Sequence, residues 1–270
     1  MRVRRHGASG ARVIVLHGGP GAAGSAGPLA RGLADSFRVE EPWQRGSGAV
    51  PLSVARHVAD LHDLVRSDPA ERRPGLVGES WGAMLALAYA VAHPEETGPI
   101  VLVGCGTFDP AARARLQRTL DERMDERIRE RLRRLEAEGI DPAERLRLRY
   151  EAIHPLYDYD PVFEEPGGGE DPPFDEAAHA ETWDDMLRLQ ADGTYPAAFR
   201  AITAPVLMIH GAHDPHPGSM IRDGLSRWIP HLEYEELPRC GHRPWAERFA
   251  RERFFARLRA WLRDRFAETP

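Results

Sequence analysis

Lysine and asparagine are absent from this chain of 270 residues, and all 36 of its basic residues are arginine. The arginines alternate with acidic residues, as they do on solvent-exposed helix faces. The exclusive use of arginine therefore does not point to a particular function. Forty-two acidic residues give a formal net charge of −6. Because this charge offers no basic surplus for phosphate backbones, we expect no nucleic-acid partner.

Long hydrophobic runs are also absent. The longest apolar stretch, residues 83–92, is too short to span a bilayer and is expected to be a buried helix. Residues 1–6 read MRVRRH and lead into no apolar segment, so no secretory signal is expected. The chain has two cysteines, Cys105 and Cys240, which we expect to be buried thiols. These absences predict a cytoplasmic protein with no membrane partner.

Short apolar strands and helices alternate through both ends of the chain. Strands are predicted near residues 13–16, 37–40, 75–78, 100–103, 205–209 and 232–237, and helices near residues 54–67, 81–93, 218–228 and 246–266. This alternation predicts an α/β fold with a mostly parallel sheet and helices on both faces.

Residues 107–200 interrupt this alternation. They contain no convincing buried strand. Apolar residues instead recur at helical spacing through a highly charged sequence, at Leu116, Leu120, Met124, Ile128, Leu132 and Leu135. We predict a helical cap over residues 107–200, inserted into one core domain formed by residues 1–106 and 201–270. A chain of this length can bury such a core.

Residues 78–82 read GESWG and lie between an apolar strand and an Ala-rich run. The pattern is typical of a nucleophile elbow, a tight strand-to-helix turn that presents a serine. Such a turn needs small residues two positions on either side, and Gly78 and Gly82 supply them. We therefore predict Ser80 as a catalytic nucleophile. An ordinary strand-to-helix connection is the alternative interpretation of these five residues alone.

Residues 17–21 read HGGPG and follow the first apolar strand directly. A glycine-rich loop at a strand end lets the backbone approach a ligand closely. Together with the elbow, it predicts an oxyanion hole formed by the backbone N–H groups of Gly19 and Trp81. No GK[ST] follows, so the loop is not a P-loop. We expect His17 to brace it.

The acid and the base that would activate Ser80 are predicted in the C-terminal part. Asp214 follows strand 205–209 and His242 follows strand 232–237, so both are expected on loops at one end of the parallel sheet. There the His242 imidazole would bridge Asp214 and Ser80. Asp109, which follows strand 100–103, is the alternative acid. The turn sequence HGAHD and its spacing to His242 favour Asp214.

Most of the twelve histidines are not expected to be catalytic. His210 and His213 flank Asp214 closely and are predicted to support its loop. His57, His62 and His93 fall on predicted helices.

The predicted cap carries a conspicuous charge pattern. Residues 150–187 contain twelve acidic residues and no arginine. Acidic residues above an acyl-transfer site would favour a substrate with a positive charge, such as a free amino terminus. A solvated acidic loop is the alternative for most of these residues taken singly.

These motifs together resemble the prolyl iminopeptidase branch of the α/β-hydrolases, serine peptidases that remove an N-terminal proline. The resemblance rests on residues 17–21 and 78–82 with Asp214 and His242, and it covers both halves of the predicted core. Residues 44–48, QRGSG, are similar to the family's DQRGxG segment, which implies that Arg45 braces the loops around the site. The resemblance also implies cap glutamates that bind the substrate's amino group.

Two positions depart from the pattern of that family. Trp43 stands where the family usually has aspartate, and Glu79 stands where it usually has glycine, immediately before the predicted nucleophile. The predicted cap is also short for that branch. We expect Trp43 and Glu79 to contact the substrate, and these departures keep a small uncharged ester, lactone or amide open as that substrate.

The predicted chemistry is a two-step acyl transfer. His242, oriented by Asp214, takes the proton of Ser80 as the hydroxyl attacks a carbonyl, and Gly19 and Trp81 hold the oxyanion. Neither a metal nor an organic cofactor is required. The predicted function is an aminopeptidase that releases an N-terminal proline or another small residue. The alternatives are a carboxylesterase, lactonase or amidase, and a non-catalytic binding protein of the same fold.

Overall fold

The computed structural model describes residues 1–71, 73–137, 139–162 and 171–268. In this part of the chain, seven strands form one sheet in the order β1-β3-β2-β4-β5-β6-β7. The strands are β1 (Val3–His6), β2 (Arg12–Leu16), β3 (Arg38–Pro42), β4 (Gly75–Glu79), β5 (Ile100–Val103), β6 (Val206–Gly211) and β7 (Glu233–Leu237). The edge strand β1 pairs antiparallel with β3, whereas the other neighbours are parallel.

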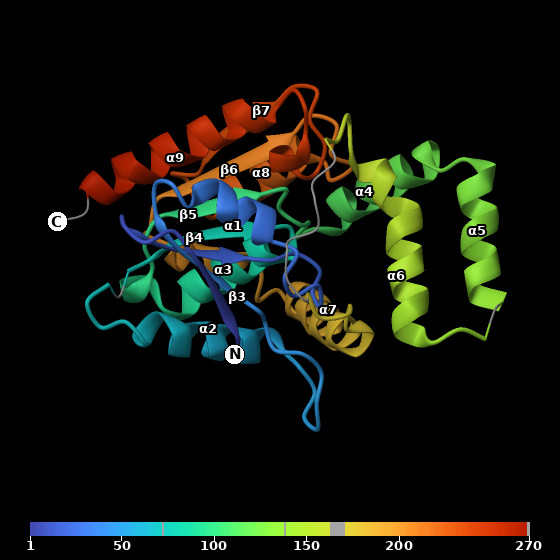
Figure 1. The fold of residues 1–270 in the computed structure, drawn as a ribbon, viewed down its shortest axis with the longest axis horizontal. Coiled ribbons are helices and arrows are strands. Elements are labelled where there is room, and N and C mark those ends of the chain that lie inside the picture. Colours follow the sequence, from blue (N-terminus) through green and yellow to red (C-terminus); the bar gives the residue numbers. More distant parts are fainter. Residues whose placement is uncertain (72, 138, 163–170, 269–270) are drawn as a thin grey trace.

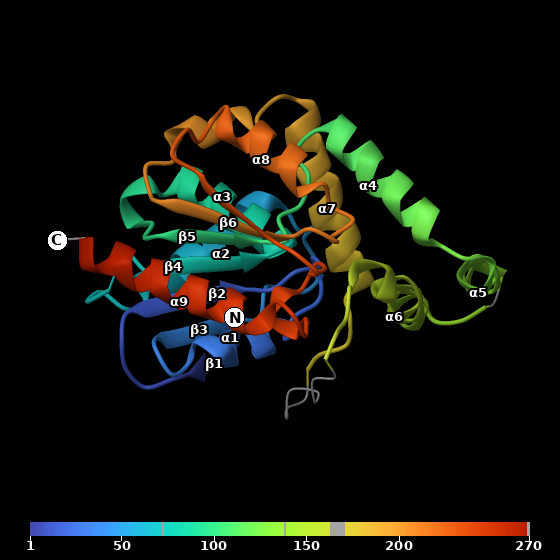
Figure 2. The same ribbon diagram turned by 90° about the horizontal axis from the view of Figure 1, so that it is seen from above.

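Helices cover both faces of this sheet (Figure 2). One face carries α2 (Val54–Arg66), α3 (Trp81–Ala92) and α8 (Gly218–Ser226), and the other carries α1 (Gly27–Leu33) and α9 (Arg251–Glu268). Side chains of β2 alternate between the two layers: Ile14 and Leu16 join the first, and Val13 and Val15 the second. Because both faces are buried, the strand reads as a continuous apolar run.

The predicted strands and core helices are all observed, and the prediction of a mostly parallel sheet is confirmed. The last helix begins later than expected because Pro244–Ala246 forms a separate 3-10 turn. The sequence pattern does not predict β1 or α1. Strand β1 is polar because it lies at the sheet edge, and α1 has only seven residues.

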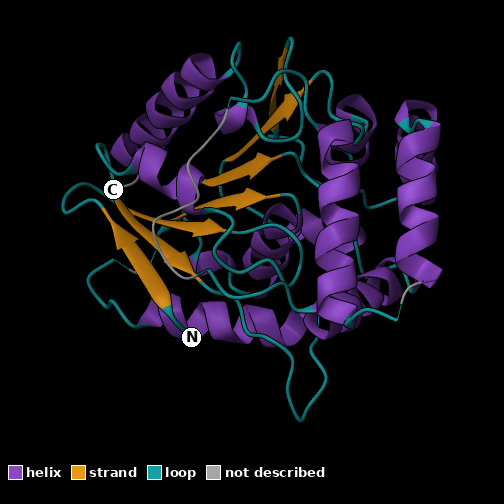
Figure 3. Ribbon diagram, turned by 45° about the vertical axis from the view of Figure 1, so that its right-hand side comes forward, coloured by secondary structure: helices purple, strands orange, loops and turns teal. Residues whose placement is uncertain are grey.

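Among the described residues, four α-helices are inserted between β5 and β6, where a helical segment is predicted. They are α4 (Pro110–Arg123), α5 (Glu126–Ala137), α6 (Pro142–Ile153) and α7 (Glu176–Ala191), which we call the insertion. In Figure 1, α4, α5 and α6 project to one side of the sheet. The arrowheads of the parallel strands in Figure 3 point toward that side. Helices α4, α5 and α6 therefore lie beyond the carboxyl ends of these strands.

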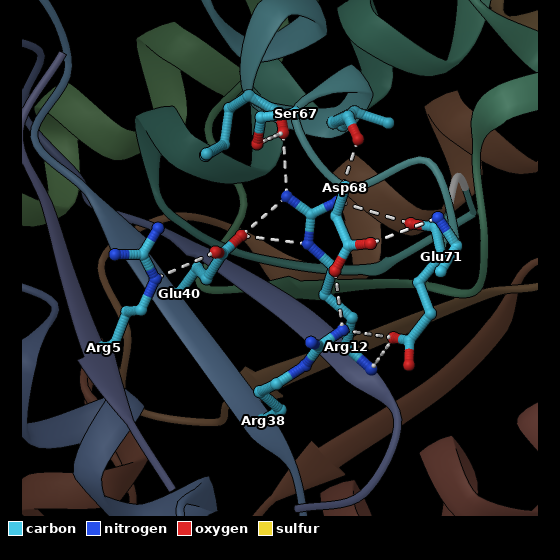
Figure 4. A network of polar contacts seen from close by, with 10 residues as sticks. Arg5, Arg12, Arg38, Glu40, Ser67, Asp68 and Glu71 are labelled. Carbon is cyan, nitrogen blue, oxygen red and sulfur yellow. Dashed lines mark hydrogen bonds and ion pairs between the residues drawn. The ribbon is translucent and has the colours of Figure 1, made fainter. Parts of the chain in front are cut away.

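A buried charged cluster stabilises the N-terminal side of the sheet. Arg12 on β2 has 1% of its surface exposed, and its Nε and Nη2 donate to Glu40 Oε2 at 2.9 and 2.7 Å. Its Nη1 donates to the carbonyl of Val65 and its Nη2 to that of Leu64, both at 2.8 Å (Figure 4). Each guanidinium nitrogen has a partner, so the cluster ties β2 and β3 to the end of α2 without leaving a charge unpaired.

Cys105 and Cys240 are buried free thiols, as predicted, and burial raises the pKa of each. No helix in the described ranges combines the length and the apolar character needed to cross a bilayer.

Candidate active site

Ser80 lies at the turn between β4 and α3. Its backbone has φ 54° and ψ −111°, a left-handed conformation that is unusual for a residue other than glycine. A Cβ on Gly78 would lie 2.2 Å from the carbonyl oxygen of Gly82, and a Cβ on Gly82 would lie 2.2 Å from that of Leu16. Only glycine fits at these two positions. The turn therefore has the steric properties that a nucleophile elbow requires.

Asp214 and His242, the predicted acid and base, are hydrogen-bonded to each other. His242 Nδ1 donates to Asp214 Oδ2 at 2.6 Å. The two residues follow β6 and β7, neighbouring parallel strands whose carboxyl ends meet at one edge of the sheet. Asp109, the alternative acid, instead caps the N-terminus of α4 and accepts a backbone N–H at 2.8 Å.

The pKa values of this pair shift in opposite directions. Burial alone would raise the pKa of Asp214, but the neighbouring imidazoles, first that of His242, hold this pKa well below its usual value. Burial alone would lower the pKa of His242. The charge and the hydrogen bond of Asp214, with the charge of Glu79, raise it instead. The arrangement thus increases the basicity of the imidazole.

Two further histidines contact the same carboxylate. His210 Nε2 lies 3.1 Å from Asp214 Oδ2, which agrees with the predicted supporting role. His216 Nδ1 donates to Asp214 Oδ1 at 3.0 Å, and its ring stacks on His242 with centroids 4.7 Å apart. His213 contributes through its backbone N–H, which donates to the carbonyl of Cys240 at 2.8 Å.

His216 is a residue that the sequence analysis missed. It stands two positions after Asp214, and its backbone N–H donates to Asp214 Oδ1 at 2.9 Å. An aspartate commonly binds the backbone two residues ahead in this way. That spacing is the signal from which His216 could have been placed near the acid, whereas its stacking on His242 depends on the tertiary fold.

The glycine loop after β2 lies beside the elbow. Gly18 donates its backbone N–H to Glu79 Oε2 at 2.8 Å, and a Cβ on Gly18 would lie 2.7 Å from the same oxygen. Gly19 has a φ of 110° and lines one cavity together with Ser80 and Trp81. Glu79 therefore fixes the loop through the N–H group of Gly18. The residue after Gly18, Gly19, is the predicted oxyanion donor.

His17 and Gln44 hold this loop against the start of α3. His17 Nδ1 donates to the carbonyl of Gly18 at 2.8 Å, and its Nε2 accepts the backbone N–H of Gln44 at 3.2 Å. Gln44 Oε1 in turn accepts from Trp81 Nε1 at 2.7 Å. Burial lowers the pKa of His17 to about 4, which keeps the imidazole neutral and able to accept that bond. Sequence reasoning did not single out Gln44, which links the two loops.

Trp43 and Arg45 take no part in the contacts between the glycine loop and the start of α3. Trp43 does not line the cavity in the described structure, and the guanidinium of Arg2 covers its ring at 4.0 Å from the centroid. Arg45 is exposed, and its Nε donates to Asp60 Oδ2 on α2 at 2.7 Å. The structure therefore does not bring Trp43 to the predicted nucleophile, and Arg45 fixes its own loop to α2.

Comparison with known families agrees with this geometry. The model of the alpha/beta hydrolase family matches residues 13–257, which include the glycine loop, the turn at Ser80, Asp214 and His242. The chain belongs to the alpha/beta hydrolase family. Among solved structures, a putative lipase from Acinetobacter baumannii superimposes on this hydrolase with a TM-score of 0.69 and 19% identity, covering 99% of this chain and 88% of that one.

The curated relatives of this alpha/beta hydrolase include two kinds of enzyme. Proline iminopeptidase from Neisseria gonorrhoeae is 40% identical over 116 residues, which are 40% of this chain and 36% of that protein. 2-Hydroxymuconate semialdehyde hydrolase from Pseudomonas putida is 30% identical over 198 residues, which are 67% of this chain and 62% of that protein. The matches thus span about a third of the first relative and less than two thirds of the second.

A cavity of about 420 Å³ joins the predicted catalytic residues to the insertion. Ser80, His216 and His242 contribute to its wall from the sheet side. From the insertion it is lined by Arg113, Leu116, Arg149, Tyr150, His179 and Trp183. The cavity of this alpha/beta hydrolase is therefore mainly apolar, with arginine and histidine side chains at several points.

The acidic lining expected from residues 150–187 is not observed in the described part of that segment. None of its described carboxylates lines the cavity. Glu181 and Asp185, for example, accept backbone N–H groups near the start of α2 at 2.7 and 2.8 Å. Glu164, Glu165 and Glu170 fall outside the described residues. The sequence shows how many acidic residues the segment has. Whether their carboxylates face the cavity depends on how α7 packs against α2.

Proposed function

We propose that this alpha/beta hydrolase cleaves a small ester, lactone or amide through a covalent acyl-Ser80 intermediate. One observation carries the proposal. The 2.6 Å bond between His242 and Asp214 orients the imidazole, and His242 and Ser80 line the same cavity. The positive φ of Ser80, between two positions that only glycine fits, supports the same conclusion. Such backbone strain is found mainly at functional sites.

The proposed reaction begins when His242 Nε2 takes the proton of Ser80 Oγ as that oxygen attacks the substrate carbonyl. Nδ1 is engaged by Asp214, so Nε2 is the ring nitrogen that exchanges protons. The backbone N–H groups of Gly19 and Trp81 would stabilise the oxyanion. His242 then protonates the leaving group, and after it departs activates a water molecule that releases the acid from Ser80.

The insertion would select the acyl part of the substrate. We propose that residues 107–200 act as a cap domain over the core of residues 1–106 and 201–270, because residues of α4, α6 and α7 line the same cavity as Ser80. The described lining contains three arginines and one carboxylate side chain, that of Glu79. Such a lining disfavours a substrate with a free ammonium group.

An aminopeptidase that releases N-terminal proline or a small residue is the second candidate. Two observations favour it: the likeness to proline iminopeptidases, and the position of Glu79 immediately before Ser80 in the cavity wall. A substrate ammonium beside Glu79 would gain a charge partner. Glu79 already accepts the Gly18 N–H at 2.8 Å, so only part of its acceptor capacity would be available.

The two candidates are tested by comparing the protein with its Ser80→Ala variant on three substrates. These are proline 4-nitroanilide, its N-acetylated counterpart and 4-nitrophenyl butyrate. We expect Ser80-dependent turnover of the ester that does not need a free amine. Turnover of the free-amine anilide alone would instead establish the aminopeptidase. If no substrate gives Ser80-dependent turnover, a non-catalytic binding protein becomes the better account.

A further inference from the structure

Three arginines line the cavity, and their charges are not equally balanced. Arg149 on α6 donates from Nη1 to Glu136 at 2.8 Å. Arg243 lies with its Nη2 3.3 Å from Asp158 Oδ2. Each of these two guanidinium groups therefore has a carboxylate partner within the protein.

Arg113 on α4 has no such partner in the described ranges of the chain. Its Nη2 donates to the neutral side-chain amide of Gln190, and its Nε is buried without any hydrogen-bond partner. Gln190 also donates to the carbonyl of Thr107 at 3.2 Å, which fixes the amide beside the cavity. The structure thus holds a cation in position and leaves its charge uncompensated.

A partly buried guanidinium without a carboxylate partner, in the wall of a mainly apolar cavity, is stabilised when an anion joins it. The planar guanidinium suits a carboxylate in particular, because two parallel N–H groups can bind its two oxygens. Leu116, one helical turn after Arg113, and Trp183 also line the cavity, so its wall offers apolar surface to the methylene chain that would join such a carboxylate to a scissile carbonyl.

We infer that Arg113 forms an anion subsite that binds a carboxylate on the acyl part of the substrate. The inference rests on the proposed function, since it names the substrate class of the same cavity. The preferred substrates would then be monoesters of short dicarboxylic acids, or lactones and amides with an equivalent acid group. Cleavage at Ser80 would leave the carboxylate on the acyl-enzyme, held by α4.

The test compares two substrates that release the same leaving group. Mono-4-nitrophenyl glutarate carries the terminal carboxylate, and 4-nitrophenyl pentanoate has a similar chain without it. The wild-type protein is expected to prefer the glutarate ester. Arg113→Gln should lower kcat/KM for the glutarate ester by roughly 10- to 100-fold, as for loss of a charged hydrogen bond, and change it for the pentanoate by less than about threefold.

Arg149→Gln is the matched control, because it removes a cavity arginine that has its own carboxylate partner. It should leave the preference between the two esters unchanged. Arg113→Lys keeps the positive charge and should retain part of the preference for the glutarate ester. If Arg113→Gln folds poorly, this variant still tests whether a positive charge at position 113 determines the preference. A wild-type protein that prefers pentanoate, or an Arg113→Gln variant that loses both activities equally, would overturn the inference.

A binding measurement separates this inference from the proposed chemistry. Glutarate is titrated by calorimetry into the Ser80→Ala variant, with and without Arg113→Gln. Binding that requires Arg113 supports the subsite even if the wild-type protein cleaves neither ester. If glutarate does not bind, or binds equally well without Arg113, the subsite does not exist, whatever the ester assays show.

Discussion

Arg12 is almost completely buried and Arg113 is partly buried, and the partners of the two guanidinium groups differ. Arg12 on β2 is almost completely buried, and each of its guanidinium nitrogens binds Glu40 or a backbone carbonyl (Figure 4). Arg113 on α4 binds a neutral amide and leaves its Nε without a partner. The first cluster is complete within the protein and stabilises the sheet. The second is incomplete and lies in the cavity wall, where a ligand can complete it.

The same contrast extends to the groups around Ser80. The predicted nucleophile has a strained backbone, and three imidazoles contact the carboxylate of Asp214. None of these features adds obvious stability, since strain and buried charge both carry a cost. We therefore expect changes on the cavity side to reduce activity and changes around Arg12 to reduce stability.

The largest effect is expected from Asp214→Asn. The amide would favour the wrong imidazole tautomer of His242 and could not balance its charge, so kcat should fall on the order of 10⁴-fold. Steady-state kinetics on the best ester measures this. Asp109→Asn is the control, because Asp109 only caps α4. A variant of Asp214 that kept more than about a tenth of the activity would contradict the predicted role of the acid.

Arg12→Met should reduce the stability of the protein and leave its activity unchanged. Removing the guanidinium leaves Glu40 partly buried without its main partner, and the free energy of unfolding should decrease by about 3–5 kcal/mol. The folded variant should keep its kcat. Urea denaturation followed by circular dichroism measures the change. Arg5→Gln is a matched control, because exposed Arg5 contacts the same Glu40 from the solvent side at 3.4 Å. Equal stability of the two variants would show that the buried cluster is not stabilising.

The fold could be predicted from the sequence wherever the local pattern reflects burial. Strands β2, β4, β5 and β6 are apolar because both faces of the sheet are covered. Gly78 is required by a backbone contact within the elbow, and Gly82 by the close approach of the end of β2. The polar edge strand β1 gives no such signal. It pairs with β3, far along the chain, and of its four side chains only the partly buried Val3 packs against an apolar layer.

The candidate site could be predicted only in part. Asp214 and His242 follow from their positions after two parallel strands, because strand order fixes which loops meet. Gln44 and His216 act through contacts with Trp81 and His242 that no spacing reveals. The position of Trp43 away from the cavity could not be predicted either, since Trp43 directly follows a strand and its ring direction depends on packing against Arg2.

Glu79→Gln should shift the pH dependence of the reaction. The base must be neutral, so kcat/KM falls as the pH decreases through the pKa of His242, which lies above the ordinary histidine value of 6.5. Glu79 is one of the charges that raise this pKa. Glutamine can still accept the Gly18 N–H but is uncharged, so the acid limb should move to lower pH.

Glu181→Gln is the control for that shift. Glu181 also accepts a backbone N–H, at 2.7 Å, but it does not line the cavity. A pH–rate profile of kcat/KM measures both variants. An acid limb that stays in place, or moves to higher pH in Glu79→Gln, would contradict the electrostatic role of Glu79.

The smallest effect is expected from Arg45→Gln. Arg45 is exposed and pairs with Asp60 on α2, and exposed ion pairs contribute little to stability. Both kcat/KM and the melting temperature should remain within experimental error of the wild-type values. A tenfold decrease in kcat/KM would instead support the bracing role that the family resemblance implies for this residue.

Covalent labelling tests whether Ser80 is an activated nucleophile. The folded protein is incubated with a fluorophosphonate, and the adduct is located by peptide mass spectrometry. We predict one adduct per chain on Ser80, no labelling of Ser80→Ala, and much slower labelling of Asp214→Asn. A folded protein that remains unlabelled, or that is modified at another residue at the same rate in Ser80→Ala, would contradict the account.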